Sequence, residues 1–128
     1  MTNYRKGVRF EYRVRDIFRR HGYAAERKAA SSPYDIMVMK GGRVVFVVDA
    51  KKTSVSGKKH IHISRDDVSK IISNASVLNA QPLVVYGFNM GDAFVAFPEE
   101  LLKNDGKTVR LEDGMLLEKF LQSYIQAA

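Results

Sequence analysis

The apolar residues near the start of the chain recur with the period of a helix. Between residues 6 and 22 they fall three or four positions apart, and the pattern ends at Gly22, a residue type that commonly terminates helices. The resulting stripe, which we expect to face the core, holds Phe10, Val14, Ile17 and Phe18. Several arginines lie on the opposite side, whereas Glu11 lies at the edge of the stripe. A carboxylate is unusual at this position.

In the segments that follow, apolar and polar residues alternate and β-branched residues are frequent, as in strands. Gly41-Gly42, between two runs rich in Val, Ile and Met, predicts an antiparallel hairpin. Further along, Ser64 as N-cap and Asp67 three residues later predict a helix start. The predicted strands are 23–28, 34–40, 43–51, 82–88 and 92–97, and the later helices are 65–79 and 115–126. The order αβββαββα predicts an α/β fold, with a mixed central sheet flanked by helices.

One predicted strand ends in charged residues. In "VVFVVDAKK", residues 44–52, five apolar residues run directly into Asp49 and Lys51. These two side chains project to the same face because successive side chains of a strand alternate. Burying a charge is costly unless a partner, a ligand or a metal compensates it. Asp49 and Lys51 can therefore act on one site, although a simple ion pair at the strand end is the alternative.

Two further carboxylates lie at the margins of buried elements. Asp35 follows "SSPY" and begins the neighbouring strand, and Glu11 lies at the edge of the first helix. Carboxylate oxygens suit Mg²⁺, or Mn²⁺ in its place, and such ions otherwise keep water and substrate phosphate oxygens as ligands. Glu11, Asp35 and Asp49 are therefore candidate metal ligands, although for Glu11 a solvated carboxylate at the helix edge is an equal alternative.

The hairpin register limits this hypothesis. If Gly41-Gly42 is a plain two-residue turn, Lys40 faces Arg43, and Asp35 and Asp49 point to opposite faces of the sheet. A β-bulge or an odd loop would instead bring Asp35 opposite Asp49. A shared metal site thus requires a bulge, an odd loop, or an Asp35 outside the regular pairing.

Composition and length narrow the class of protein. A chain of 128 residues with 45% hydrophobic and 27% charged residues is typical of one soluble globular domain, which we assign to residues 1–128. The chain has no cysteine, which excludes disulfides and thiolate metal sites and is compatible with the cytoplasm. We find neither an apolar run long enough to span a membrane nor the apolar core of a signal peptide, so we expect an intracellular protein.

The net charge of +7 is unevenly distributed. Residues 1–60 hold 15 Lys and Arg against 5 Asp and Glu, whereas residues 61–128 hold 6 against 9. A segregated basic excess favours a surface that binds a polyanion, and nucleic acid is the foremost candidate. The alternative is a basic half that is merely solvated.

These motifs resemble a known nuclease family. Asp35 after "SSPY", followed by "DAK" at 49–51, resembles the PD-(D/E)xK nuclease signature. The opening "YRKGVRFE", the stretch "HGYAAERKAASS" and the helix after the basic loop resemble more narrowly the archaeal-type Holliday junction resolvases, the Hjc family. The resemblance covers roughly residues 4–100, and it implies a restriction-endonuclease-like core and a Mg²⁺-dependent endodeoxyribonuclease that resolves four-way DNA junctions.

The resemblance also implies roles at the reaction site. Glu11, Asp35 and Asp49 would hold the metal, with the Ala50 carbonyl as a further ligand, and Lys51 would orient or activate the attacking water. Two more groups match family positions near the scissile phosphate: Arg27, and a loop serine that is either Ser31 or Ser32. Asp49 departs from the family, which more often has the longer Glu there.

The resemblance and the basic half together indicate the DNA-binding residues. We expect phosphate contacts from Arg5, Lys6, Arg9, Ser31, Lys52, Lys58 and Lys59. His60 and His62 are interpreted as surface or DNA-contacting residues rather than metal ligands, and His21 as a residue interacting with a helix dipole. Because a four-way junction is nearly two-fold symmetric and needs paired cuts, we expect a homodimer.

Two other functions remain open at this point. One is a different PD-(D/E)xK nuclease, acting on duplex ends, flaps or single strands. The other is a nucleic-acid-binding module without catalysis, which would be favoured if the candidate carboxylates and Lys51 proved to lie far apart.

Overall fold

A computed structural model describes residues 2–29, 32–53, 59–88 and 91–127, with side chains in the terminal helices described from residue 8 and up to residue 124. None of the described helices is long and apolar enough to cross a membrane. The elements are α1 (Thr2–Arg20), β1 (Ala24–Arg27), β2 (Ile36–Lys40), β3 (Arg43–Thr53), β4 (His60–Ser64), α2 (Arg65–Val77), β5 (Gln81–Phe88), β6 (Ala93–Ala96), α3 (Pro98–Leu101), β7 (Thr108–Glu112), β8 (Met115–Leu116) and α4 (Leu117–Ala127).

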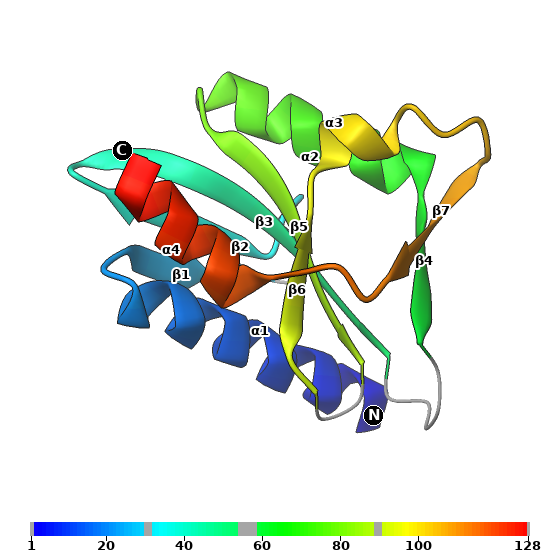
Figure 1. Cartoon of the computed structure of the whole chain (residues 1–128), viewed down its shortest axis with the longest axis horizontal. Helices are drawn as coiled ribbons and strands as arrows, with labels where there is room; N and C mark the ends of the chain where they lie inside the picture. The colour runs from blue at the N-terminus through cyan, green and yellow to red at the C-terminus, as the bar shows by residue number, and fades with distance from the viewer. Residues whose placement is uncertain (1, 30–31, 54–58, 89–90, 128) are drawn as a thin grey trace.

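The main sheet is mixed and lies between layers of helices. Its strand order is β1-β2-β3-β5-β6-β8, and β3 and β5 pair in parallel while the other neighbours are antiparallel. Helices α1 and α4 cover one face and α2 covers the other (Figure 1). Phe46 and Val48 of β3 pack with the first layer, whereas Val47 between them packs with α2. This alternation confirms the predicted mixed sheet flanked by helices.

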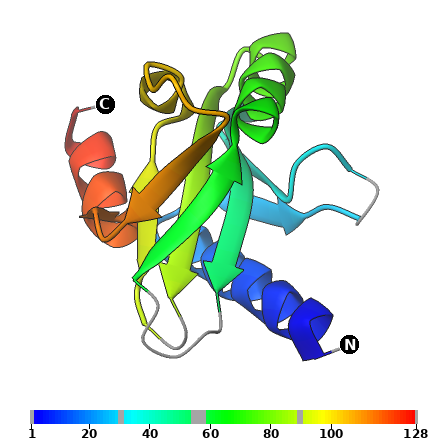
Figure 2. The ribbon, with the colours of Figure 1, turned by 90° about the vertical axis from the view of Figure 1, so that its right-hand side faces the viewer.

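A second, two-stranded sheet was not predicted. Strand β4 pairs antiparallel with β7, and both lie across the α2 side of the main sheet (Figure 2). Ile61, Ile63, Val109 and Leu111 are buried beneath this pair. Each strand has only two apolar residues, and the partners lie more than 40 residues apart in the sequence, so neither segment alone gives a strong strand pattern. The order αβββαββα is correct for the elements it names, but β4, α3, β7 and β8 must be added to it.

The hairpin of β2 and β3 contains both a tight turn and a bulge. Gly41 and Gly42 have φ angles of 62° and 77°, and Lys40 faces Arg43, so the two-residue turn is present. The register then shifts, because Met39 faces Val44 while Val38 faces Phe46. Val45 is therefore the extra residue. This shift supplies the bulge that a shared site for Asp35 and Asp49 requires.

Helix α1 packs closely onto β5 at a glycine. A Cβ atom added to Gly87 would lie 2.8 Å from Cε1 of Phe10, a ring that is 2% exposed. Two arginines hold the same helix at its polar side: Arg13 donates to the Gly91 carbonyl at 2.8 Å, and Arg19 donates to the Ala25 carbonyl at 2.9 Å. The position of Glu11, next to Phe10, thus depends on this close contact.

We expect Gly87→Ala to destabilise the protein by about 1–3 kcal/mol, because the added methyl group must displace a buried ring. Urea unfolding would measure the change. Ser76→Ala, at an exposed position of α2, is the control and should change the stability by no more than about 0.5 kcal/mol. Equal stability of Gly87→Ala and the parent would contradict the close packing of α1 on β5.

Candidate functional site

The centre of the site is a pair of carboxylates, Asp35 and Asp49. Asp35 is held by its backbone on both sides, since its N–H donates to Val48 O at 3.0 Å and its carbonyl accepts from Lys28 N at 2.8 Å. The side chain is also fixed, because Oδ2 accepts from the Ala50 N–H at 2.7 Å. Continuing the register beyond Ile36 and Val48 brings Asp35 opposite Asp49. The bulge therefore aligns the two carboxylates.

Asp49 has an unusual protonation equilibrium. Burial, the hydrogen bond with the Asp35 side chain and the Asp35 charge together raise the pKa of Asp49 to about 7, against the opposing effect of Lys51. Only 16% of the Asp49 side chain is exposed. Two carboxylates in a half-buried position are electrostatically unfavourable unless a proton or a cation lies between them.

Lys51 lies between two carboxylates from different elements. Its Nζ is 3.5 Å from Oδ2 of Asp49 on β3 and 3.5 Å from Oδ2 of Asp67 on α2. Burial alone would lower the pKa of Lys51, but the charges of Asp49 and Asp67 outweigh it and raise that pKa above its ordinary value. Lys51 is therefore a charged ammonium at neutral pH, next to the carboxylate pair.

Glu11 lies near this pair but interacts with an arginine. Its Oε1 accepts a hydrogen bond of 2.7 Å from Nε of Arg27, and each of the two side chains is 19% exposed. Burial and the charge of Asp35 raise the pKa of Glu11 above its usual value, although Arg27 opposes this effect. Glu11, Arg27 and Asp35 thus form one electrostatic neighbourhood, contributed by α1, β1 and the segment preceding β2.

The predicted three-carboxylate metal site is only partly assembled. Within the described ranges, no three His, Cys, Asp or Glu side chains converge as ligands for one ion. Asp35 and Asp49 lie together, whereas Glu11 forms its ion pair with Arg27. Ala50 contributes a backbone N–H to Asp35, and the role of its carbonyl stays a prediction.

The remaining predicted residues are only partly described. Arg9 and Lys59 are exposed, and Lys52 is half-buried at the end of β3. Ser32 is half-buried, with its N–H donating to Ala29 O at 2.9 Å and its Oγ lying 3.5 Å from Tyr34 N. The side chains of Arg5 and Lys6, together with Ser31 and Lys58, lie outside the described part of the chain.

Each of the three histidines contacts a residue outside the carboxylate pair. His60 and His62 stack edge to face on β4, with ring centroids 5.4 Å apart, and His60 lies 3.3 Å from an Arg110 nitrogen. His21 Nε2 is 3.4 Å from Glu118 Oε1, so it interacts with α4 in addition to ending α1. His62 is exposed and His60 is half-buried, whereas contact of either residue with DNA stays a prediction.

Asp67 is the residue that the sequence interpretation missed at this site. The helix start was predicted correctly, since Ser64 Oγ accepts from the Asp67 N–H at 3.1 Å. Because Asp67 was explained by its position at the helix start, its tertiary contact with Lys51 was not predicted. The available signal was topological, because a helix that links two parallel strands starts above the end of the first strand.

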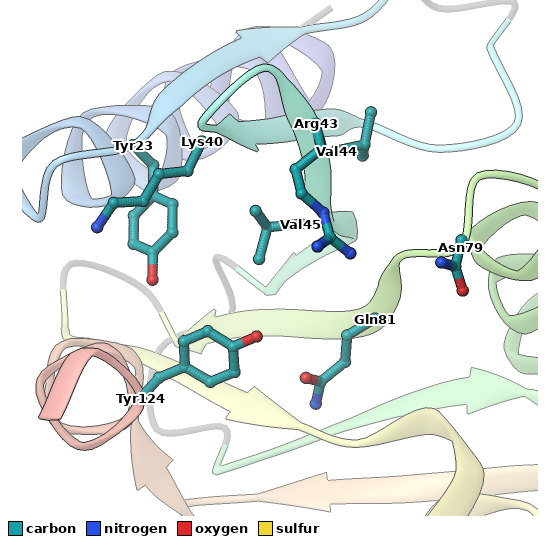
Figure 3. A pocket seen from close by; sticks show the side chains of 8 residues that line it. All are labelled: Tyr23, Lys40, Arg43, Val44, Val45, Asn79, Gln81 and Tyr124. Atoms are coloured by element: carbon teal, nitrogen blue, oxygen red, sulfur yellow. The ribbon is translucent and has the colours of Figure 1, made fainter. Parts of the chain in front are cut away.

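A cavity of about 440 Å³ lies at the other end of β3. It is lined by Arg43 and Gln81, at the starts of β3 and β5, and by the rings of Tyr23 and Tyr124 (Figure 3). Near it, α2 ends in Val77, which is 85% exposed, and Leu78 follows at 36%. By contrast, Phe94 and Phe97 are half-buried and pack against the core clusters, so they are less available for contact with another chain.

Comparisons with known proteins agree with this arrangement. Residues 2–127 match the family described as archaeal Holliday junction resolvase (Hjc). A curated relative, the crossover junction endodeoxyribonuclease Hjc of Methanocaldococcus jannaschii, is 27% identical over 110 residues, which are 86% of this chain and 78% of the relative.

A solved structure has the same fold. It is that of Archaeoglobus fulgidus Hjc, a Holliday junction resolvase, which superposes with a TM-score of 0.76 at 19% identity, over 91% of this chain and 96% of the other. Since the family match spans nearly the whole sequence, the chain belongs to the archaeal Holliday junction resolvase family.

Proposed function

We propose that this protein resolves four-way DNA junctions by Mg²⁺-dependent hydrolysis of phosphodiester bonds, with paired cuts by a homodimer. The observation that carries the proposal is the cluster of Asp35, Asp49 and Lys51, in a chain that belongs to a resolvase family. We further propose that the protein acts in the cytoplasm, with which a chain lacking cysteine is compatible.

The residues present fit a hard divalent cation. Asp35 and Asp49 lie together, and the raised pKa of Asp49 marks a position where an added positive charge is favourable. Mg²⁺ commonly takes one or two carboxylates and fills its other positions with water and phosphate oxygens, so a pair of ligands is sufficient. We therefore propose Asp35 and Asp49 as the metal ligands, with Glu11 and the Ala50 carbonyl as further candidates.

A bound Mg²⁺ or Mn²⁺ would lower the pKa of water and offset the charge of the phosphate. The Lys51 ammonium, which is adjacent to Asp49, would orient the attacking water and stabilise the negative charge that develops on the phosphoryl oxygens. Arg27, anchored by Glu11 at 2.7 Å, would bind a non-bridging phosphate oxygen. Exposed Arg9 and Lys59, with Lys52, would hold the DNA backbone on either side.

Paired cuts require two sites in one assembly. We propose that two copies associate through the exposed end of α2, because Val77 is an 85% exposed apolar side chain and Asn79, two residues further along the chain, lines the cavity of Tyr23 and Tyr124. Asp67 and Val77 are ten residues apart on α2, so this surface lies about 15 Å along the helix from the carboxylates. Dimerisation there would leave both sites open to DNA.

The proximity of the carboxylates to Lys51 argues against a purely binding module. A nuclease for duplex ends, flaps or single strands remains the second candidate, because the same cluster could cut any phosphodiester.

The first prediction from this proposed function concerns the stability of the metal-free protein. The pKa of Asp49 is about 7 in the folded chain, against 3.8 in an unperturbed carboxyl, so the folded state binds the extra proton between these values. Stability should therefore fall as the pH rises from about 4 to 7 and stay lowered above 7. At pH 8 without metal, Asp49→Asn should be more stable than the parent, by up to roughly 4 kcal/mol.

The gain of Asp49→Asn should vanish near pH 4, and added Mg²⁺ should raise the melting temperature of the parent alone. Thermal unfolding in EDTA and in Mg²⁺ measures both effects. Asp105→Asn, at an exposed loop position, is the control and should follow the parent. An Asp49→Asn variant no more stable than the parent at pH 8 would contradict the crowding of Asp35 and Asp49.

The second prediction concerns catalysis and substrate. Lys51→Ala and Asp35→Asn should each slow cleavage by at least about 100-fold. The affinity for the junction should stay close to that of the parent, because these side chains act in the chemical step rather than in DNA binding. Lys103→Ala removes an exposed lysine from the opposite half of the sequence and should change neither quantity.

The parent should cut a four-way junction in preference to duplex, flap and single-stranded DNA of the same sequences, with paired nicks across the branch point. Side-by-side cleavage assays at matched salt would measure the preference. Equal cutting of linear duplex would favour the second candidate function instead.

The third prediction concerns the dimer. Val77→Glu should shift the protein to monomer in sedimentation experiments and abolish paired nicking, because the interface would then bury a charge. Met115→Glu is the matched control, since Met115 is another exposed apolar side chain, at 49%, and should leave the dimer intact. A Val77→Glu protein that remains dimeric would remove this surface from the interface.

A further inference from the structure

We infer that Asp67 is a positioning residue for Lys51. It is not a predicted metal ligand, and its sequence context indicated only a helix cap. The inference rests on the proposed role of Lys51 in the reaction, and it adds the residue that holds the ammonium group in place.

The first observation is the geometry around Nζ of Lys51. Two carboxylates lie at the same distance from it, 3.5 Å, one on its own strand and one on α2. A lysine side chain has a flexible four-carbon stem, and a single partner two residues away on the same strand leaves it free to swing. A second partner from another element restricts that movement.

The two carboxylates that contact Lys51, those of Asp49 and Asp67, take part in different further interactions. Asp49 shares a hydrogen bond with the Asp35 side chain and belongs to the carboxylate pair. Asp67 comes from α2 and lies outside that pair. Asp67 can therefore hold the ammonium group whatever Asp49 binds.

Asp67 itself is held firmly. Its backbone N–H donates to Ser64 Oγ at 3.1 Å, and Ser64 ends β4 opposite Thr108. One turn further along α2, the buried Ile71 packs with Val47 of β3. Contacts in the core thus fix α2 over the strand that carries Lys51, and the Asp67 carboxylate is presented from a rigid element.

The ion pair between Lys51 and Asp67 contributes little to folding stability. The side chains of Lys51 and Asp67 are 31% and 45% exposed, and pairs with this exposure contribute little to folding stability. Positioning accounts better for a carboxylate that reaches from α2 to the lysine beside Asp49.

The preceding residue offers a matched control. Asp66 also lies in the first turn of α2, and it pairs with Lys70 at 3.1 Å on the exposed side of the helix. Asp66→Asn and Asp67→Asn remove the same charge from the same helix end. Only Asp67→Asn removes a partner of Lys51.

The test is single-turnover cleavage of a four-way junction at saturating protein, with junction affinity measured separately. Asp67→Asn should lower the maximal cleavage rate on the order of 10- to 100-fold and leave the affinity for the junction within about twofold. Misplacement of a reacting group slows the chemical step without weakening DNA binding. Asp66→Asn should change neither quantity, and Asp67→Glu should recover much of the rate.

A double-mutant cycle separates positioning from a general structural effect. Adding Asp67→Asn to Lys51→Ala should cause no further loss of rate, because the group that Asp67 positions is already absent. A separate readout is the ¹⁵N signal of the Lys51 ammonium in lysine-labelled protein, which Asp67→Asn should broaden or shift and Asp66→Asn should not.

The outcomes that overturn the inference are distinct from those that overturn the function. An Asp67→Asn protein with the parent rate, or additive losses in the cycle, would overturn the positioning role while Lys51→Ala stayed inactive. Full activity of Lys51→Ala would overturn the role of Lys51 and this inference with it.

Discussion

The candidate site depends on the close approach of two carboxylates, Asp35 and Asp49, which the fold holds together at the edge of a hydrophobic core. The extra residue Val45 brings them together, because it shifts the hairpin register by one position. The approach is unfavourable in isolation, as the raised pKa of Asp49 indicates. The surrounding core makes it possible, since Phe46, Val47 and Val48 are fully buried just before the strand becomes charged.

The rest of the fold places the positively charged side chains of Lys51 and Arg27 near these two carboxylates. The parallel pairing of β3 with β5 requires a crossover, and the crossover places the start of α2 above Lys51. The close contact of α1 with Gly87 fixes the helix that carries Glu11, and Glu11 in turn orients Arg27. The elements that carry these charged groups are therefore fixed by buried contacts, which is the arrangement that a site for phosphate chemistry requires.

The sequence predicted those features that depend on local pattern. The helices, the main strands, the Gly41-Gly42 turn and the Ser64 cap were all visible as periodicity or turn chemistry, and register arithmetic identified the need for a bulge. The pairing of β4 with β7 was not predictable from short strands far apart in the sequence. The contact of Asp67 with Lys51 and the ion pair of Glu11 with Arg27 were not predicted, for the same reason, because both depend on tertiary packing.

Location of the divalent ion tests the central claim most directly. Crystals grown with Mn²⁺ and measured at an anomalous wavelength would identify the metal by its own signal. We predict a peak about 2.1 Å from oxygens of both Asp35 and Asp49, with Lys51 Nζ beside a water on the metal. A strong peak bound elsewhere, for example at His60 and His62, with none between the two aspartates, would contradict the account.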